Sequence, residues 1–160
     1  MVKPEKEARK IVASNRRAST KYEFIETLEA GMVLTGPEVK SLRAGGANLQ
    51  DGFARVDGEQ IFLWNVHIAP YTLGSLHVTQ DPVRTRKLLL HHKEILRWMG
   101  KTMVKGLTIV PLEIYFKNGK AKISLALAKG KRGPDQREDI KRRVVNREIQ
   151  REFSGRHKIK

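Results

Sequence analysis

The stretch "LTIVPLEIYFKNGKAKISLALAKG" (residues 107–130) predicts a β-hairpin and therefore decides the fold class. Its two β-prone runs are joined by Asn118-Gly119, a dipeptide favoured in the tightest hairpin turns. In the second run, Ile123, Leu125 and Leu127 alternate with polar or small residues, which makes one face of the strand apolar. We expect a sheet with one buried side.

Further strands are predicted on the N-terminal side of this hairpin. The segment "KYEFIETLEAG" (21–31) has β-prone residues and ends at a glycine. In "GFARVDGEQIFLWNVHI" (52–68), Asp57-Gly58 lies between two β-prone runs, which predicts a second hairpin with a type I′ turn. Pro111 has no backbone N–H, so its strand should lie at an edge or contain a bulge.

A short helix is predicted for "GPEVKSLRAGG" (36–46). Proline stands in its first turn, and two glycines follow as a stop signal. Val39 and Leu42 are three residues apart, as are Lys40 and Arg43 on a different face. This helix should pack on the domain and present positive charge at the same time.

A second helix is predicted to begin at Asp81-Pro82 and to end at Gly100, with apolar residues and one histidine at helical spacing: Leu88, His92, Ile95 and Met99. Several short antiparallel strands with few helices indicate a small closed or nearly closed barrel. The predicted fold is therefore mainly β, with about three flanking helices and a basic C-terminal tail.

Both ends of the chain are rich in positive charge and poor in apolar residues. We predict a flexible basic arm over residues 1–19, a folded core over 20–129 and a tail over 130–160. From Lys129 onward there are twelve Lys and Arg against five Asp and Glu, a net charge of +7. Arg143, Arg147 and Arg151 are spaced by four and would form one cationic row on a helix.

The apolar residues of that tail are divided between two sides of the same helix, which leaves little contiguous surface for docking. An isolated helix of this length is only marginally stable in water. We therefore expect the tail to be disordered when free and to become helical on its partner.

The overall composition indicates a polyanionic partner. The chain has 32 Lys and Arg against 17 Asp and Glu, a net charge of +15, so nucleic acid is the leading candidate. A membrane partner is disfavoured, because no strongly amphipathic stretch carries bulky aromatic residues on its apolar side. With no cysteine, no secretory signal and no apolar span, we expect a soluble, cytoplasmic protein. We also expect it to be a monomer.

The sequence carries no recognisable catalytic motif. It has no serine elbow, metalloprotease helix or kinase-type set, and the adjacent His91 and His92 cannot share a metal from one helix face. We expect no enzyme activity, no cofactor and no metal. A nuclease that uses His77, His91 or His157 is the enzymatic alternative, although no complete site can be assembled from them.

Several segments in order resemble the SmpB family, the SsrA-binding proteins of bacteria. The resemblance extends from about Asn15 to Glu138 and is carried by "ASNRRAS", "LEAGMVLTGPEVKSLRAGGANLQDGFA", "NVHIAPY", "DPVRTRKLLLHHKEI", "GLTIVPLEIYF" and "LALAKGKRGPDQRE". Among these, "EVKSLRAG" and "RTRKLLL" are the most specific.

The resemblance implies an OB-like barrel that binds the tRNA-like domain of transfer-messenger RNA and takes part in the rescue of stalled ribosomes. It also implies that the tail enters the vacant mRNA channel and the decoding centre of the small subunit. A basic segment that orders only inside an RNA-walled channel can test whether a message is present. The alternative is a general ribosome-associated structural protein or RNA chaperone, which would show little preference for a tRNA-like fold.

The resemblance also implies which residues contact RNA. For the core these are Asn15, Arg16, Arg17, Glu29, Glu38, Lys40, Arg43, Leu89 and Lys122. For the tail they are Gly130, Lys131, Arg132, Asp135, Gln136, Arg137, Arg143, Arg147 and Arg151. Each core residue also has a structural interpretation: Glu29 could satisfy donors at a turn, Leu89 could be core, and Lys122 could be a solvated strand residue.

The tail motif departs from the family pattern at two positions. Here it is "GKRGPDQR", where the family usually has something like "GKKxxDKR". Gln136 replaces a lysine and removes one phosphate contact, and Pro134 stands where a bulkier side chain capable of stacking is common. The segment before Tyr22 also differs, because Ser19-Thr20 replaces basic or histidine residues.

Overall fold

The computed structural model describes residues 9–71, 81–104, 106–131 and 136–156. The chain divides into two compact units, Met1–Gly130 and Lys131–Lys160. The first contains the barrel, and the second contains the helix α4, Gln136–Arg156. No helix among the described ranges is long and apolar enough to cross a membrane.

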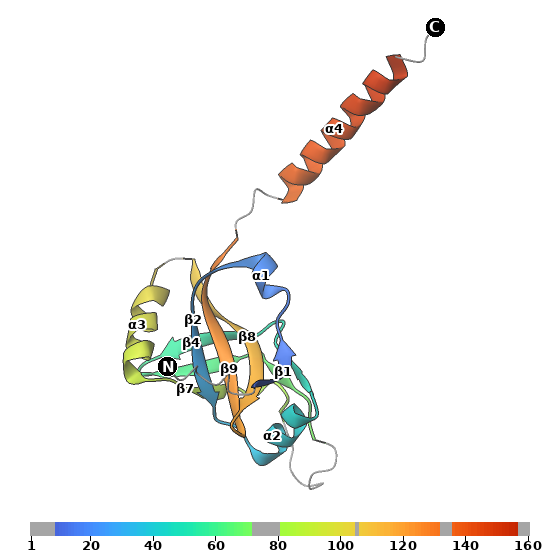
Figure 1. The fold of residues 1–160 in the computed structure, drawn as a ribbon. Coiled ribbons are helices and arrows are strands. Elements are labelled where there is room, and N and C mark those ends of the chain that lie inside the picture. The colour runs from blue at the N-terminus through green and yellow to red at the C-terminus, as the bar shows by residue number, and fades with distance from the viewer. Residues whose placement is uncertain (1–8, 72–80, 105, 132–135, 157–160) are drawn as a thin grey trace, which may run out of the picture. The chain divides into compact units, whose positions relative to one another are not determined.

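The first unit is built on a seven-stranded antiparallel sheet with the strand order β1-β8-β4-β5-β7-β2-β9 (Figure 1). Its strands are β1 (Arg9–Ser14), β2 (Tyr22–Met32), β4 (Phe53–Asp57), β5 (Gln60–Trp64), β7 (Arg86–Leu89), β8 (Leu107–Lys117) and β9 (Lys120–Gly130). Because β8 also pairs with β9, the strands from β8 round to β9 close into a ring. This confirms the predicted barrel.

Smaller elements lie beside the ring. Two short strands, β3 (Ala47–Asn48) and β6 (His67–Ile68), pair with each other. Among the described residues of this unit, the helices are α1 (Ala18–Lys21), α2 (Gly36–Arg43) and α3 (His92–Thr102), which agrees with the expected number of flanking helices.

The hairpin of β8 and β9 forms as the sequence predicts. Asn118 and Gly119 have φ angles of 51° and 74°, as a type I′ turn requires, and Lys117 pairs with Lys120. The register shifts between Pro111 and Glu113, so the predicted bulge is also present. Apolar residues that alternate along β9 point into the barrel and join its core: Ile123, Leu125 and Leu127.

The turn of the other hairpin differs from the predicted type. Asp57 pairs with Gln60, so the two loop residues are Gly58 and Glu59 rather than Asp57 and Gly58. Only Gly58 has a positive φ, of 60°, whereas a type I′ turn needs positive φ at both loop positions. A glycine at the first loop position is typical of a type II′ turn. A type I′ turn is disfavoured here because its second loop position would force the glutamate to a positive φ.

The helix predicted over residues 82–100 is wrong in its first half. Arg86 and Leu88 are buried while Lys87 and Leu89 are exposed, an alternation that belongs to strand β7. The helix α3 begins only at His92 and continues past Gly100 to Thr102. At Asp81, the side chain accepts a hydrogen bond from the Val83 N–H (3.0 Å), which forms a local turn instead of a helix start.

The predicted N-terminal arm also contains regular structure. Strand β1 pairs with β8 from Arg9–Lys117 to Ser14–Glu113, so residues 9–14 belong to the sheet. Residues 1–8 lie outside the described part of the chain. The apolar residues that would have indicated this strand are few, since only Ile11, Val12 and Ala13 occur in it.

Candidate nucleic-acid interface

Asn15 fixes an exposed turn that carries two arginines. Its Nδ2 donates to the carbonyl oxygens of Leu49 (3.4 Å) and Pro111 (3.2 Å), and its backbone N–H donates to Leu112 O (2.7 Å). These bonds hold the end of β1 against β8 and leave Arg16 and Arg17 exposed before α1. The structure thus brings three predicted RNA-binding residues together, with Asn15 in a positioning role.

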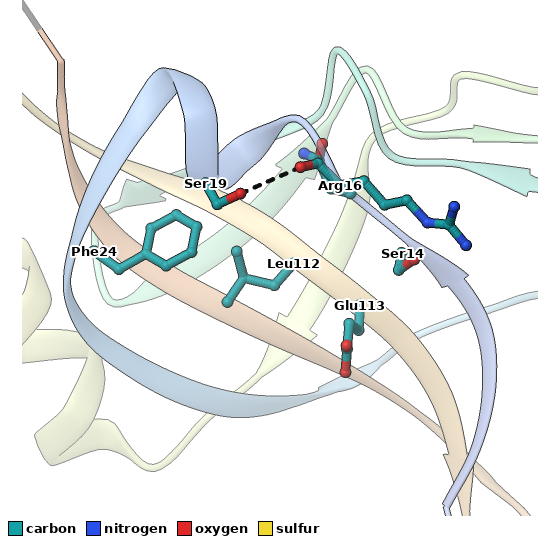
Figure 2. Close-up of a pocket in the computed structure, with 7 residues that line it drawn as sticks. Ser14, Arg16, Ser19, Phe24, Leu112 and Glu113 are labelled. Carbon is teal, nitrogen blue, oxygen red and sulfur yellow. Dashed lines mark hydrogen bonds between the residues drawn. The ribbon is translucent and has the colours of Figure 1, made fainter. Parts of the chain in front are cut away.

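Three concave surfaces surround this turn. The first has a volume of about 260 Å³ and is lined by Ser14, Asn15, Arg16, Ser19, Phe24, Leu112 and Glu113. Figure 2 shows Phe24 beside Leu112, while the Ser19 hydroxyl donates to the Arg16 carbonyl oxygen at 3.3 Å. The partly exposed Phe24 ring is a surface on which an unpaired base can stack, and Arg16, whose side chain extends away from Phe24 in Figure 2, supplies a separate positive charge.

The other two surfaces adjoin the same arginines. One, of about 210 Å³, is lined by Arg17, Lys21, Tyr22, Gln50 and Phe53 among others. The other, of about 200 Å³, is lined by Ser14, Asn15, Arg16, Arg17, Asn48 and Gln50. Cations, amide groups and rings are the side chains that single-stranded or looped RNA contacts.

A second group of predicted residues lies on the outside of the barrel. Leu89 of β7 pairs with Gly31 of β2, which in turn pairs with Lys122 of β9. A side chain at position 31 would place its Cβ 3.3 Å from the Leu89 Cβ, so glycine provides room for this leucine. Leu89 is 53% exposed, which excludes the core interpretation and leaves its side chain accessible to a partner.

Glu29 lies two residues before Gly31, within β2 rather than at a turn. It accepts a hydrogen bond from the Tyr115 hydroxyl and lies 3.5 Å from Arg9 and 3.7 Å from Lys117. The Arg9 guanidinium also stands 4.5 Å from the centre of the Tyr115 ring. Glu29 therefore satisfies side chains of β1 and β8, and not the backbone donors of a turn.

Burial and the neighbouring Glu29 carboxylate raise the pKa of Tyr115 above the ordinary tyrosine value. The phenol, which is protonated at neutral pH in any tyrosine, therefore keeps its proton and its hydrogen bond to Glu29 in more alkaline solution as well. This bond orients the carboxylate, which in turn holds Arg9 and Lys117 on the outer face of the barrel.

Glu38 is buried, which does not support the predicted RNA contact. It is 6% exposed and lies in the first turn of α2, where its Oε1 accepts from Thr35 N (3.2 Å) and Arg84 Nε (3.2 Å). Its Oε2 accepts from Arg86, whose guanidinium also donates to Val66 O (2.8 Å) and Pro82 O (3.2 Å). Glu38 therefore positions α2 on β7.

The other two predicted residues of α2 are on its exposed side, as expected. Lys40 lies 5.6 Å from the centre of the Tyr71 ring, and Arg43 lies 5.7 Å from the centre of the Phe116 ring. Sequence reasoning did not identify Arg84 and Arg86 as the partners of Glu38. The signal was present in "RTRKLLL", where a strand period places Arg86 and Leu88 on the same buried face.

Replacing Glu38 by glutamine should destabilise the protein at neutral pH and much less in acid. Removing one charge from a buried ion pair costs about 3 kcal/mol, because the arginines lose their counter-charge. Burial tends to raise the pKa of Glu38, but hydrogen bonds from Arg84 and Arg86 outweigh this and lower it below the ordinary value of 4.5. Because the pKa of Glu38 is lower in the folded than in the unfolded protein, its ionised carboxylate stabilises the fold fully above about pH 4.5. This stabilisation is lost as the pH falls from there through the lowered pKa of the folded state.

Denaturant unfolding of both proteins at pH 7 and at acidic pH measures this difference. The free energies of unfolding should converge in acid, where the protonated carboxyl resembles the amide. Glu23→Gln, at an exposed position of β2, is the matched control and should behave as the unchanged protein. An equal loss at both pH values would show that the charge of Glu38 is not what stabilises α2.

The tail forms a helix in the structure, and its described side chains are exposed. Arg143, Arg147 and Arg151 are exposed and follow one another by four residues, so they share a face of α4. The apolar residues Val144, Val145 and Ile149 are exposed to between 46 and 51%. Of the remaining predicted residues, Gly130 ends β9 and Lys131 is exposed. Arg132 and Asp135 lie outside the described residues, as do the side chains of Gln136 and Arg137.

Comparison with known proteins gives consistent matches along the chain. A family model described as "SmpB protein" matches residues 12–155. The SsrA-binding protein of Pelotomaculum thermopropionicum is 55% identical over 150 residues, which cover 94% of this chain and 97% of the relative. That of Enterococcus faecalis is 52% identical over 142 residues, covering 89% and 92%.

A solved structure is also similar. It is described as "tmRNA-SmpB: a journey to the center of the bacterial ribosome", and its matching chain is 52% identical to this one. The match has a TM-score of 0.64 and covers 76% of this chain and 85% of the other.

Proposed function

The chain belongs to the SmpB family, and from this premise we propose that it binds the tRNA-like domain of transfer-messenger RNA and delivers it to stalled ribosomes for trans-translation. The observation that carries the proposal is the 55% identity to an SsrA-binding protein over 94% of the chain. Because the proposed partner is the ribosome, we expect the protein to act in the cytoplasm. The proposed role is that of an adaptor and includes no chemical step.

The barrel supplies the surface that holds the RNA. Arg16 and Arg17 are exposed on a turn that Asn15 anchors, so their cations are positioned for phosphates without the ordering of a long loop. Leu89 and Lys122 flank Gly31 on the outer side of the sheet. We assign phosphate contacts to the cations, and the choice of partner to RNA shape and exposed bases.

The tail supplies the contact with the ribosome. Its cationic row of Arg143, Arg147 and Arg151 can neutralise phosphates along one side of a helix, while its exposed apolar residues are too divided to form a stable docking face. In this proposal the tail occupies the vacant mRNA channel and the decoding centre, and a bound message excludes it.

A binding competition at physiological salt tests the function. Labelled tRNA-like domain is displaced from the full-length protein by unlabelled tRNA-like domain or by an unstructured RNA of equal length. We expect the structured RNA to compete at least tenfold better, because charge alone favours neither RNA and shape must decide. Equal competition would instead support the general RNA-chaperone alternative.

A further inference from the structure

The outer face of β4, β5 and β7 carries a group of rings and cations that the proposed function does not use. Cross-strand pairing arranges them in rows: Phe53 faces Trp64, and Arg55 faces Phe62, which faces Lys87. The residues between them, among them Ala54, Leu63 and Leu88, point into the core. We call Phe53, Arg55, Phe62, Trp64 and Lys87 the aromatic face.

Trp64 is the most accessible ring of this face. It is 41% exposed, although tryptophan is on average a highly buried residue. Its ring is stacked on Phe53 at a centroid distance of 6.5 Å and an interplanar angle of 5°, so its plane is set by a neighbour. Within the described ranges no other ring or cation lies over Trp64. A flat, oriented and accessible indole is a suitable stacking partner for a base.

The charge on the aromatic face favours RNA over an apolar protein segment. Arg55 and Lys87 are exposed on either side of Phe62, and the Arg55 guanidinium lies 5.2 Å from the centre of the Phe53 ring. Cations placed beside rings match the phosphate and the base of one nucleotide. The face is also continuous with the candidate interface, because Phe53 lines the same concave surface as Arg17 and Lys21.

We propose that the aromatic face binds an unpaired nucleotide of the RNA, with the base stacked on Trp64 and the phosphate held by Arg55 or Lys87. This deepens the proposed function and rests on it, since it adds a second contact region to the same partner. Stacking reads only the flat surface of a base, so the site accepts different bases but requires that the base be unpaired.

Tryptophan fluorescence tests the proposal, because Trp64 and the fully buried Trp98 are the two tryptophans of the chain. The full-length protein is titrated with a short single-stranded oligoadenylate and with a fully paired RNA duplex of the same length. We expect the single strand to quench the emission and the duplex to leave it nearly unchanged. Trp64→Phe should abolish the quenching while it keeps a ring for stacking.

Affinity is measured separately with labelled RNA. Trp64→Ala should weaken single-strand binding by roughly tenfold and leave duplex binding unchanged, since only the stacked base loses its partner. Trp64→Phe should retain most of the single-strand affinity that Trp64→Ala loses. Leu96→Ala is the matched control, because Leu96 is 40% exposed and lies on α3 outside the aromatic face. Thermal unfolding verifies that all variants are folded.

Two results would overturn the proposal: quenching that persists in Trp64→Phe, or single-strand affinity that Trp64→Ala leaves unchanged. A protein that shows either result and still prefers the tRNA-like domain in the competition would keep its proposed function without this site. A protein that passes the fluorescence test but shows no such preference would keep the stacking site and lose the proposed function.

Discussion

Removal of residues 131–160 should abolish ribosome rescue and leave the affinity for the tRNA-like domain nearly unchanged. β9 ends at Gly130, so the truncation interrupts no strand of the barrel. Every core residue assigned to RNA contact also lies in the unit Met1–Gly130. The lost segment carries the cationic row, which in the proposed mechanism is the part that enters the mRNA channel.

The measurement pairs RNA binding with rescue of ribosomes stalled at the end of a message that lacks a stop codon. Within the full-length chain, replacing Arg143, Arg147 and Arg151 by glutamine should reproduce most of the rescue defect. Val144→Ala with Ile149→Ala alters the helix elsewhere and should have little effect, because these residues are exposed and make no continuous stripe. Truncation that abolishes RNA binding and spares rescue would reverse the division of roles between barrel and tail.

The second large effect should come from salt. Binding of the tRNA-like domain should weaken by a factor on the order of 10³ between about 50 and 200 mM monovalent salt, with a linear relation between log affinity and log salt. Each phosphate that a lysine or arginine neutralises releases counterions, and a chain with a net charge of +15 presents many such groups.

Arg16→Ala and Arg17→Ala should each make this negative slope shallower by about one, because each removes one phosphate contact. Both are exposed on the turn that Asn15 anchors, so neither substitution disturbs the core. Lys93→Ala removes the same charge from the exposed side of α3 and is the matched control, with an expected slope close to that of the unchanged protein. A binding constant insensitive to salt would contradict the electrostatic basis of the interface.

Local signals predicted those elements whose conformation depends on neighbouring residues. The turn at Asn118-Gly119 formed as a type I′ turn, and α2 formed with Glu38 capping the backbone N–H of Thr35 (3.2 Å). The helix prediction for residues 82–100 was wrong because the four-residue spacing from Leu88 to His92 is typical of a helix but arises here by chance. Leu88 belongs to the strand β7, and His92 begins the following helix α3. Only the pairing of β7 with β2 and β5 resolves that ambiguity.

In the candidate site, too, the sequence predicted local features but not contacts between distant residues. The exposed positions of Arg16, Arg17, Lys40 and Arg43 agree with the charge pattern of the sequence. Burial of Glu38 does not follow from its neighbours, because its partners Arg84 and Arg86 lie 46 and 48 residues away. The strand period of "RTRKLLL" is compatible with an exposed Leu89, but nothing near it in the sequence indicates that it lies beside Gly31.

The positive charge, the basic tail, the turn at Asn118-Gly119 and the family could be read from the residues alone, because charge and backbone preference belong to individual residues and their neighbours. The tertiary structure decided which charges are paired and which remain accessible. It placed β1 on β8, about a hundred residues later in the chain, and it set Trp64 with Phe53 on the outer face of the barrel. Burial and pairing depend on residues that only the closed sheet brings together.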